Sequence, residues 1–98
     1  LRHLLDDVRY QMEHNSFYLD ELVARFHHRL VLIHPFPNGN GRHARLMADL
    51  LIHQLGGNSF TWGGSSLDKA SEIRTRYINA LRAADKGDIV PLVLFMRS

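Results

Sequence analysis

The sequence predicts an all-α protein folded as one compact helical bundle. Apolar residues recur every three or four positions through most of the chain, which is the spacing of one helix face. The length of 98 residues suits one small domain. No repeat, low-complexity tract or linker divides the chain. We therefore treat residues 1–98 as a single domain.

Two amphipathic helices are expected before residue 34. The first covers residues 1–12, and the polar residues 14–16 are expected to break it. The second runs from Leu19 to Ile33 with a regular apolar stripe. It ends before Pro35, because a residue that precedes proline is pushed away from the helical region.

A third helix is expected to start near Arg42 and to stop at Gly56 and Gly57. Its apolar face is wide, so we expect a central and largely buried helix. That face consists of Leu46, Met47, Leu50, Leu51, Ile52 and Leu55.

A fourth helix capped by Ser65 or Ser66, and a short buried helix over residues 89–96, complete the prediction. Asp88 is expected to cap the short helix. Pro91 falls in its first turn, where the missing N–H does little harm. A strand is the alternative for this segment, but it would have no partner strand in this chain.

Composition and charge exclude several classes of protein. Lysine and arginine (12) exceed aspartate and glutamate (10) by two, a basic balance too small to indicate nucleic acid by itself. The absence of cysteine excludes disulfides, thiolate metal sites and cysteine nucleophiles. No apolar run approaches the roughly 20 residues that span a membrane. No signal-peptide pattern is present, so we expect a cytoplasmic protein. The chain starts with Leu1 inside an apolar pattern, and we expect further residues upstream.

The loop before the third helix combines turn-forming residues with side chains suited to phosphate chemistry. Gly39 and Gly41 let backbone N–H groups converge at a helix start, where the helix dipole also favours anions. Arg42 and Arg45 lie three residues apart, so both can reach that point. His34, on the opposite lip, titrates near neutral pH and can take a proton from a hydroxyl. Together these are the minimum equipment for phosphoryl or nucleotidyl transfer.

The same loop resembles the Fic motif, which reads His-x-Phe-x-(Asp/Glu)-Gly-Asn-Gly-Arg-x-x-Arg. The matching residues are His34, Phe36, Gly39, Asn40, Gly41, Arg42 and Arg45. Asn38 departs from the motif, because the family usually has an acidic residue there. The flanking residues 25–30 and 48–51, with residues 62–64, resemble a Fic subgroup called mobile mystery protein B.

The resemblance implies an enzyme that moves AMP from ATP to a hydroxyl side chain of a target protein, which the sequence does not name. His34 is then the general base. The backbone of residues 39–41 and the amide of Asn40 hold the α- and β-phosphates. Arg42 contacts the phosphates, and Arg45 contacts their β/γ end.

The resemblance also implies Mg²⁺ on the pyrophosphate and a nucleoside pocket. The acidic residue of the family helps to hold Mg²⁺, whereas Asn38 offers only a neutral oxygen, so we expect weak binding of Mg²⁺ by the protein. Tyr77 and Asp85 lie where the family lines its nucleoside pocket. A strand hairpin that aligns the target peptide is expected upstream of Leu1.

Other functions stay open. Because Asn38 is neutral, transfer of another nucleotide or of phosphate is one alternative. A nucleotide-binding module without turnover is another. Nucleic-acid binding through residues 42–45 is disfavoured, because no aromatic residues interleave with that patch. The sequence leaves open whether two copies form a homodimer.

Several residues near the loop have structural expectations. The histidines lack the spacing of zinc ligands, and His27 or His28 is instead expected to hydrogen bond the active loop. Asp49 lies one turn after Arg45 and is expected to pair with it. Trp62, with Phe60, is expected to belong to the core.

Overall fold

The computed structural model describes residues 2–33, 39–65 and 68–98, with side chains from residue 17 onward. Every regular element in these ranges is a helix, which confirms the all-α prediction. The helices are α1 (Arg2–Ile33), α2 (Asn40–Gln54), α3 (Ala70–Asp85) and α4 (Val90–Met96). The motif-bearing loop joins α1 to α2.

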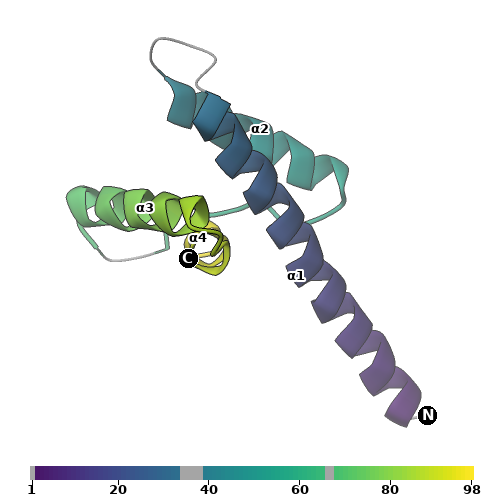
Figure 1. Cartoon of the computed structure of the whole chain (residues 1–98). Coiled ribbons are helices and arrows are strands. Elements are labelled where there is room, and N and C mark those ends of the chain that lie inside the picture. Colours follow the sequence, from purple (N-terminus) through teal and green to yellow (C-terminus); the bar gives the residue numbers. More distant parts are fainter. Residues whose placement is uncertain (1, 34–38, 66–67) are drawn as a thin grey trace.

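The first helix, α1, is continuous over 32 residues, so the expected break at residues 14–16 is wrong. His14, Asn15 and Ser16 favour a helix less than alanine does, but none carries the larger penalty of glycine or proline. Figure 1 shows the first turns of α1 extending beyond the other three helices, whereas its C-terminal half lies among them.

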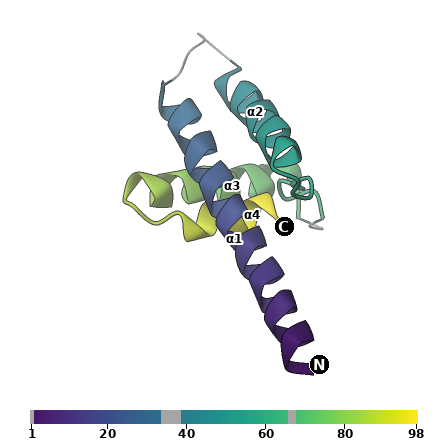
Figure 2. The ribbon, with the colours of Figure 1, turned by 90° about the vertical axis from the view of Figure 1, so that its right-hand side faces the viewer.

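The second helix, α2, packs beside the C-terminal half of α1 (Figure 2). Small residues form this contact on α2, where Ala44 and Ala48 are fully buried and Ile52 follows one turn later. Positions i, i+4 and i+8 lie near one another on a helix face. Because alanine side chains are short, the two helix backbones can approach closely here.

The expected wide, buried apolar face of α2 is confirmed at Leu51 and Ile52, which belong to or pack against the core, and is wrong for the other leucines. Leu46 and Leu50 are 58% and 49% exposed, and Leu55 is 39% exposed. The alanine stripe and the leucine stripe both repeat with helical spacing, so periodicity alone could not choose between them. Close packing against α1 selects the alanine stripe, which turns Leu46, Leu50 and Leu55 outward.

The third helix, α3, begins at Ala70 and has no side-chain cap, so the expected cap at Ser65 or Ser66 is wrong. The turn that precedes α3 is hydrogen bonded to the end of α4 instead. The backbone N–H of Trp62 donates to the carbonyl of Met96 at 3.0 Å. This bond holds the preceding turn against the end of α4, and the helix starts only after the turn.

The last helix, α4, confirms the expected short helix over the strand alternative. Pro91 lies in its first turn. The cap residue is Ile89 and not the expected Asp88, although the side chain of Asp88 accepts a hydrogen bond from the Val90 N–H at 3.2 Å.

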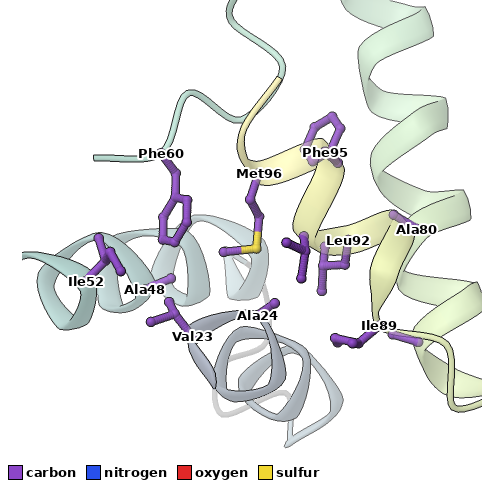
Figure 3. Close-up of a cluster of buried hydrophobic side chains, with 12 residues drawn as sticks. Val23, Ala24, Ala48, Ile52, Phe60, Ala80, Ile89, Leu92, Phe95 and Met96 are labelled. Atoms are coloured by element: carbon purple, nitrogen blue, oxygen red, sulfur yellow. The ribbon is translucent and has the colours of Figure 1, made fainter. Parts of the chain in front are cut away.

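All four helices and the loop before α3 contribute to the core. Figure 3 shows Met96 pointing from α4 toward α1 and α2. The buried cluster includes Val23, Ala24, Ala48, Ile52, Phe60, Ala80, Leu92, Phe95 and Met96. This packing fixes the angle at which α3 and α4 meet the α1–α2 pair, and so it shapes the surface beside the start of α2.

Arg97 fastens the C-terminal end of the chain to α1. Its guanidinium donates to both carboxylate oxygens of Asp20, with distances of 2.7 Å from Nε and 2.5 Å from Nη2. Its Nη1 donates to the carbonyls of Asn58 and Ser59 at 2.8 and 3.0 Å. The guanidinium also lies 4.3 Å from the centre of the Phe60 ring. One side chain therefore joins α1, the loop and the end of α4 in forked geometry.

Candidate functional site

A cleft of about 550 Å³ lies between the start of α2 and one face of α3. The residues described along its wall include three arginines and three aromatic residues but no acidic one. The arginines are Arg42, Arg45 and Arg74, and the aromatic residues are Trp62, Tyr77 and Phe95. Arginine binds phosphate, and aromatic rings stack on bases. This wall therefore suits an anionic ligand that carries a planar group.

Gly39 turns the chain into α2 at the edge of the cleft. Its φ is 76°, which is in the left-handed region that glycine adopts without strain. The first helical hydrogen bond of α2 joins the His43 N–H to the Gly39 carbonyl at 3.0 Å. Backbone N–H groups at a helix start point outward, along the positive end of the helix dipole. Gly41 and Arg42 also line the cleft, so this anion-favouring helix end faces it.

Gly41, Arg45 and Tyr77 converge beside the helix start. A Cβ atom on Gly41 would lie 3.2 Å from Nη1 of Arg45 and 4.0 Å from the Tyr77 hydroxyl. The guanidinium carbon of Arg45 lies 5.5 Å from the centre of the Tyr77 ring, within the range of a cation–π contact. Because Gly41 has no side chain, the Arg45 guanidinium can lie close to the backbone at the start of α2.

His27 lies fully buried behind this wall. Its Nε2 and the Tyr77 hydroxyl are 2.8 Å apart, and its ring centre is 4.8 Å from that of Trp62. Burial lowers the pKa of His27 to about 4, against the smaller opposing effect of the Ala44 backbone, and the charge of Arg45 lowers it further. The imidazole is therefore neutral at neutral pH.

Trp62 forms another part of the cleft wall. Its φ is 51°, an uncommon conformation for a residue other than glycine. The indole Nε1 donates to Asp49 at 2.9 Å, and this bond helps to hold the residue in place. Trp62 is half-buried and packs against the core while it also lines the cleft, and Phe60 belongs to the core as expected. The partner that the structure gives to Asp49 is Trp62 rather than the expected Arg45.

The structure brings most of the described candidate residues together. Those that line the cleft are Gly39, Gly41, Arg42, Arg45 and Tyr77. Asn40 is the first residue of α2 and is half-buried. His34, the expected base, and Asn38, the expected metal ligand, lie outside the described residues.

Asp85 lies apart from the cleft. It is eight residues beyond Tyr77 on α3, or about 12 Å along the helix axis. Its Oδ1 is 2.7 Å from Nε2 of His28, and the pair links α3 to α1. The structure therefore separates Asp85 from Tyr77, the other residue expected in a nucleoside pocket.

Sequence reasoning missed several residues of the cleft wall, among them Arg74 and Phe95. Arg74 precedes Tyr77 by three residues, a spacing that puts both side chains on one helix face, so this signal was present. Phe95 reaches the cleft only because α4 packs against α3. No local pattern could have indicated that contact.

Two other features are absent from the described residues. No group of three or more histidine, aspartate or glutamate side chains there is placed to hold a metal ion. Within the same residues, no helix combines the length and apolar character needed to cross a membrane.

The fold and the cleft define a class of protein: a small all-helical domain in which a helix start, arginines and aromatic rings share one cleft. The chain belongs to the Fic/DOC family, whose family model matches residues 1–52. This match covers α1, the motif-bearing loop and most of α2.

The similar curated proteins are protein adenylyltransferases by name. Protein adenylyltransferase fic-1 of Caenorhabditis briggsae is 33% identical over 98 residues, which cover 98% of this chain and 18% of that protein. Protein adenylyltransferase Fic of Drosophila mojavensis is 34% identical over 82 residues, which cover 84% of this chain and 15% of that protein. The chain thus spans less than a fifth of the length of these relatives. No solved structure matches it.

Proposed function

We propose that this chain is the core of an enzyme that transfers AMP from ATP to a hydroxyl side chain of a target protein. The observation that carries the proposal is the cleft at the start of α2, where Arg42, Arg45 and Arg74 meet the helix end beside Trp62 and Tyr77. The positive groups suit a polyphosphate, and the aromatic rings suit a base. Membership of the Fic/DOC family and the names of the relatives support AMP as the transferred group.

In the proposed reaction, the target hydroxyl oxygen attacks the α-phosphorus of ATP. The bond from that phosphorus to the bridging oxygen of the β-phosphate breaks, and pyrophosphate leaves. His34 accepts the proton of the hydroxyl. Arg42, Arg45 and the N–H groups at the helix start hold the phosphates and stabilise their charge, which is the main requirement of such transfers.

Mg²⁺ is proposed only as a companion of the nucleotide. The described wall of the cleft is basic, aromatic and aliphatic, and it supplies no carboxylate ligand. Hard cations such as Mg²⁺ prefer oxygen ligands. These residues therefore do not form a protein site for the metal, and the phosphates with Asn38 are left as its proposed ligands. No step of the proposed reaction passes through it.

The finer assignments belong to the same proposal. Residues 25–30, 48–51 and 62–64 support placement in the mobile mystery protein B-like subgroup of the family. Tyr77 lines the cleft, which supports a role at the edge of the nucleoside pocket. Asp85 pairs with His28, so we leave it out of the proposed site. The cytoplasm remains the proposed setting.

The experiment supplies the protein with ATP labelled at the α-phosphate, in the presence of a cell extract. A parallel sample carries the label at the γ-phosphate, and His34→Ala is the matched control. We expect the α-label alone to appear on protein, either on the enzyme itself or on a target in the extract. We expect His34→Ala to abolish that labelling, because the target hydroxyl then keeps its proton.

Transfer of the γ-label would replace AMP transfer by phosphoryl transfer. Binding of ATP without transfer of either label, in a series that also includes other nucleotides, would instead favour the non-catalytic module. Labelling that survives His34→Ala would remove His34 from the role of base.

A further inference from the structure

His27 and Tyr77 make a buried hydrogen bond whose direction can be assigned. The two residues come from α1 and α3 and are 50 positions apart, yet His27 Nε2 and the Tyr77 hydroxyl are 2.8 Å apart. His27 is fully buried and neutral at neutral pH. A neutral imidazole carries one proton, so one ring nitrogen donates and the other accepts.

The surroundings of Nδ1 decide which nitrogen carries the proton. Nδ1 is buried and has no hydrogen-bond partner among the described residues. The nearby Ala44 backbone nevertheless raises the pKa of the ring, as an accepting carbonyl does and a donating N–H does not. A carbonyl near the ring favours a proton on Nδ1 over a lone pair there. The proton therefore belongs on Nδ1, and Nε2 accepts from the Tyr77 hydroxyl.

The Tyr77 oxygen then turns its lone pairs toward the cleft. Burial raises the pKa of Tyr77, so the hydroxyl keeps its proton, although Arg45 opposes this through its charge and a hydrogen bond. The guanidinium carbon of Arg45 lies 5.5 Å from the centre of the Tyr77 ring, and because arginine only donates, its contact with the Tyr77 oxygen runs from Arg45 to Tyr77. The guanidinium ends beside Gly41, where a Cβ atom would lie 3.2 Å from Nη1. Each group thus fixes the orientation of the next, from His27 through Tyr77 to Arg45.

We propose that His27 and Tyr77 are positioning residues that hold the Arg45 guanidinium at the start of α2 for the terminal phosphates of a nucleoside triphosphate. The proposal rests on the proposed function in one respect, since it takes Arg45 to bind phosphate. The arginine side chain is long and has many rotamers. Fixing its orientation before the ligand binds reduces the conformational entropy lost on binding. The relay, defined as His27, Tyr77 and Arg45, therefore acts on the phosphates through the Tyr77 hydroxyl, whereas the role proposed above at the edge of the nucleoside pocket belongs to the Tyr77 ring.

The test compares Tyr77→Phe with the wild-type protein by isothermal titration calorimetry. The substitution removes the hydroxyl and keeps the ring that lines the cleft. Tyr18→Phe is the matched control, because Tyr18 is 61% exposed on α1 and does not line the cleft. The probes are ATP, inorganic tripolyphosphate and AMP. Thermal unfolding of each variant checks that the fold is kept.

We expect Tyr77→Phe to lower the affinity for ATP and for tripolyphosphate by about tenfold, which is the effect of losing one hydrogen bond to a charged group. The affinity for AMP should change less than about twofold, since AMP lacks the phosphates that Arg45 holds. An equal loss of affinity for AMP would assign the Tyr77 hydroxyl to the nucleoside and overturn the relay. Unchanged affinity for all three probes would overturn it as well, and so would a wild-type protein that does not bind tripolyphosphate.

A nitrogen NMR spectrum of the wild-type imidazoles tests the direction of the relay without any variant. We expect His27 to carry its proton on Nδ1 and to keep this state from pH 8 to pH 5.5. A proton on Nε2 would reverse the hydrogen bond to Tyr77 and overturn the relay. If tripolyphosphate binding depends on Tyr77 as expected while no AMP is transferred, the relay stands and the proposed function fails.

Discussion

Gly41 belongs to the first turn of α2 and also lines the cleft, next to the Arg45 guanidinium. The space that its missing side chain leaves is occupied by the guanidinium of Arg45, whose Nη1 would lie 3.2 Å from a Cβ atom. Glycine usually weakens a helix, so its presence in the first turn of α2 calls for a local reason. The close approach of Arg45 supplies that reason.

Gly41→Ala should therefore separate binding from stability. An added Cβ pushes the Arg45 guanidinium away from the helix start, and we expect ATP affinity, measured by calorimetry, to fall about five- to tenfold, as for one lost charged hydrogen bond. The free energy of unfolding should stay equal or rise by up to about 1 kcal/mol, because alanine favours the helix. Asn79→Ala, exposed on α3, is the control for the added helix propensity. Unchanged ATP affinity in Gly41→Ala would contradict this account.

At the scale of elements, the contact between α1 and α2 depends on side-chain size. Ala44 and Ala48 on α2 are fully buried, and so is Ala24 on α1. Small residues at such a crossing set the distance between the helix axes. That distance also determines how the start of α2 lies against α3, and therefore the width of the cleft.

We expect Ala48→Leu to lower the free energy of unfolding by about 1–3 kcal/mol, as overpacking of a filled core does. Gln54→Leu places the same residue at an exposed position of the same helix and should change the stability by about 0.5 kcal/mol or less. Urea denaturation of both variants measures the difference. Equal stability of the two would mean that the α1–α2 contact is loose enough to accept a leucine.

At the scale of the whole molecule, stability should depend on pH through His27. Burial lowers the pKa of this imidazole from 6.5 to about 4, so the folded state binds its proton less readily than the unfolded state. The stabilising contribution is therefore fully present above pH 6.5, declines as the pH falls from 6.5 towards 4, and is absent below 4. Two and a half pKa units correspond to about 3 kcal/mol at most.

Urea denaturation at pH 7, 5.5 and 4 measures this loss. We expect the free energy of unfolding to fall between pH 7 and pH 4, with a slope that approaches about 1.4 kcal/mol per pH unit from this group. His27→Gln should be less stable at pH 7 and should flatten the dependence, since glutamine does not titrate. His53→Gln, at an exposed position, should leave the slope unchanged. A slope that persists in His27→Gln would assign the pH dependence to other groups.

The sequence by itself determined the features that depend on neighbouring residues. Helical periodicity predicted the all-α fold, and the contiguous run from Gly39 to Arg45 predicted an anion-binding helix start, because a helix places residues three and four apart on one face. The same local pattern misled where two stripes competed, as in α2, and where weak helix formers suggested a break, as in α1.

Only the tertiary structure decided which distant residues meet. His27 and Tyr77 lie 50 positions apart in the sequence and on different helices, and Phe95 reaches the cleft from α4. Such contacts depend on the angles at which helices cross. Those angles follow from how buried side chains fill space, and many sequences with the same periodicity would fill it differently. The identity of the phosphate-binding loop is thus local information, whereas the orientation of Arg45 within the cleft is a property of the packed whole.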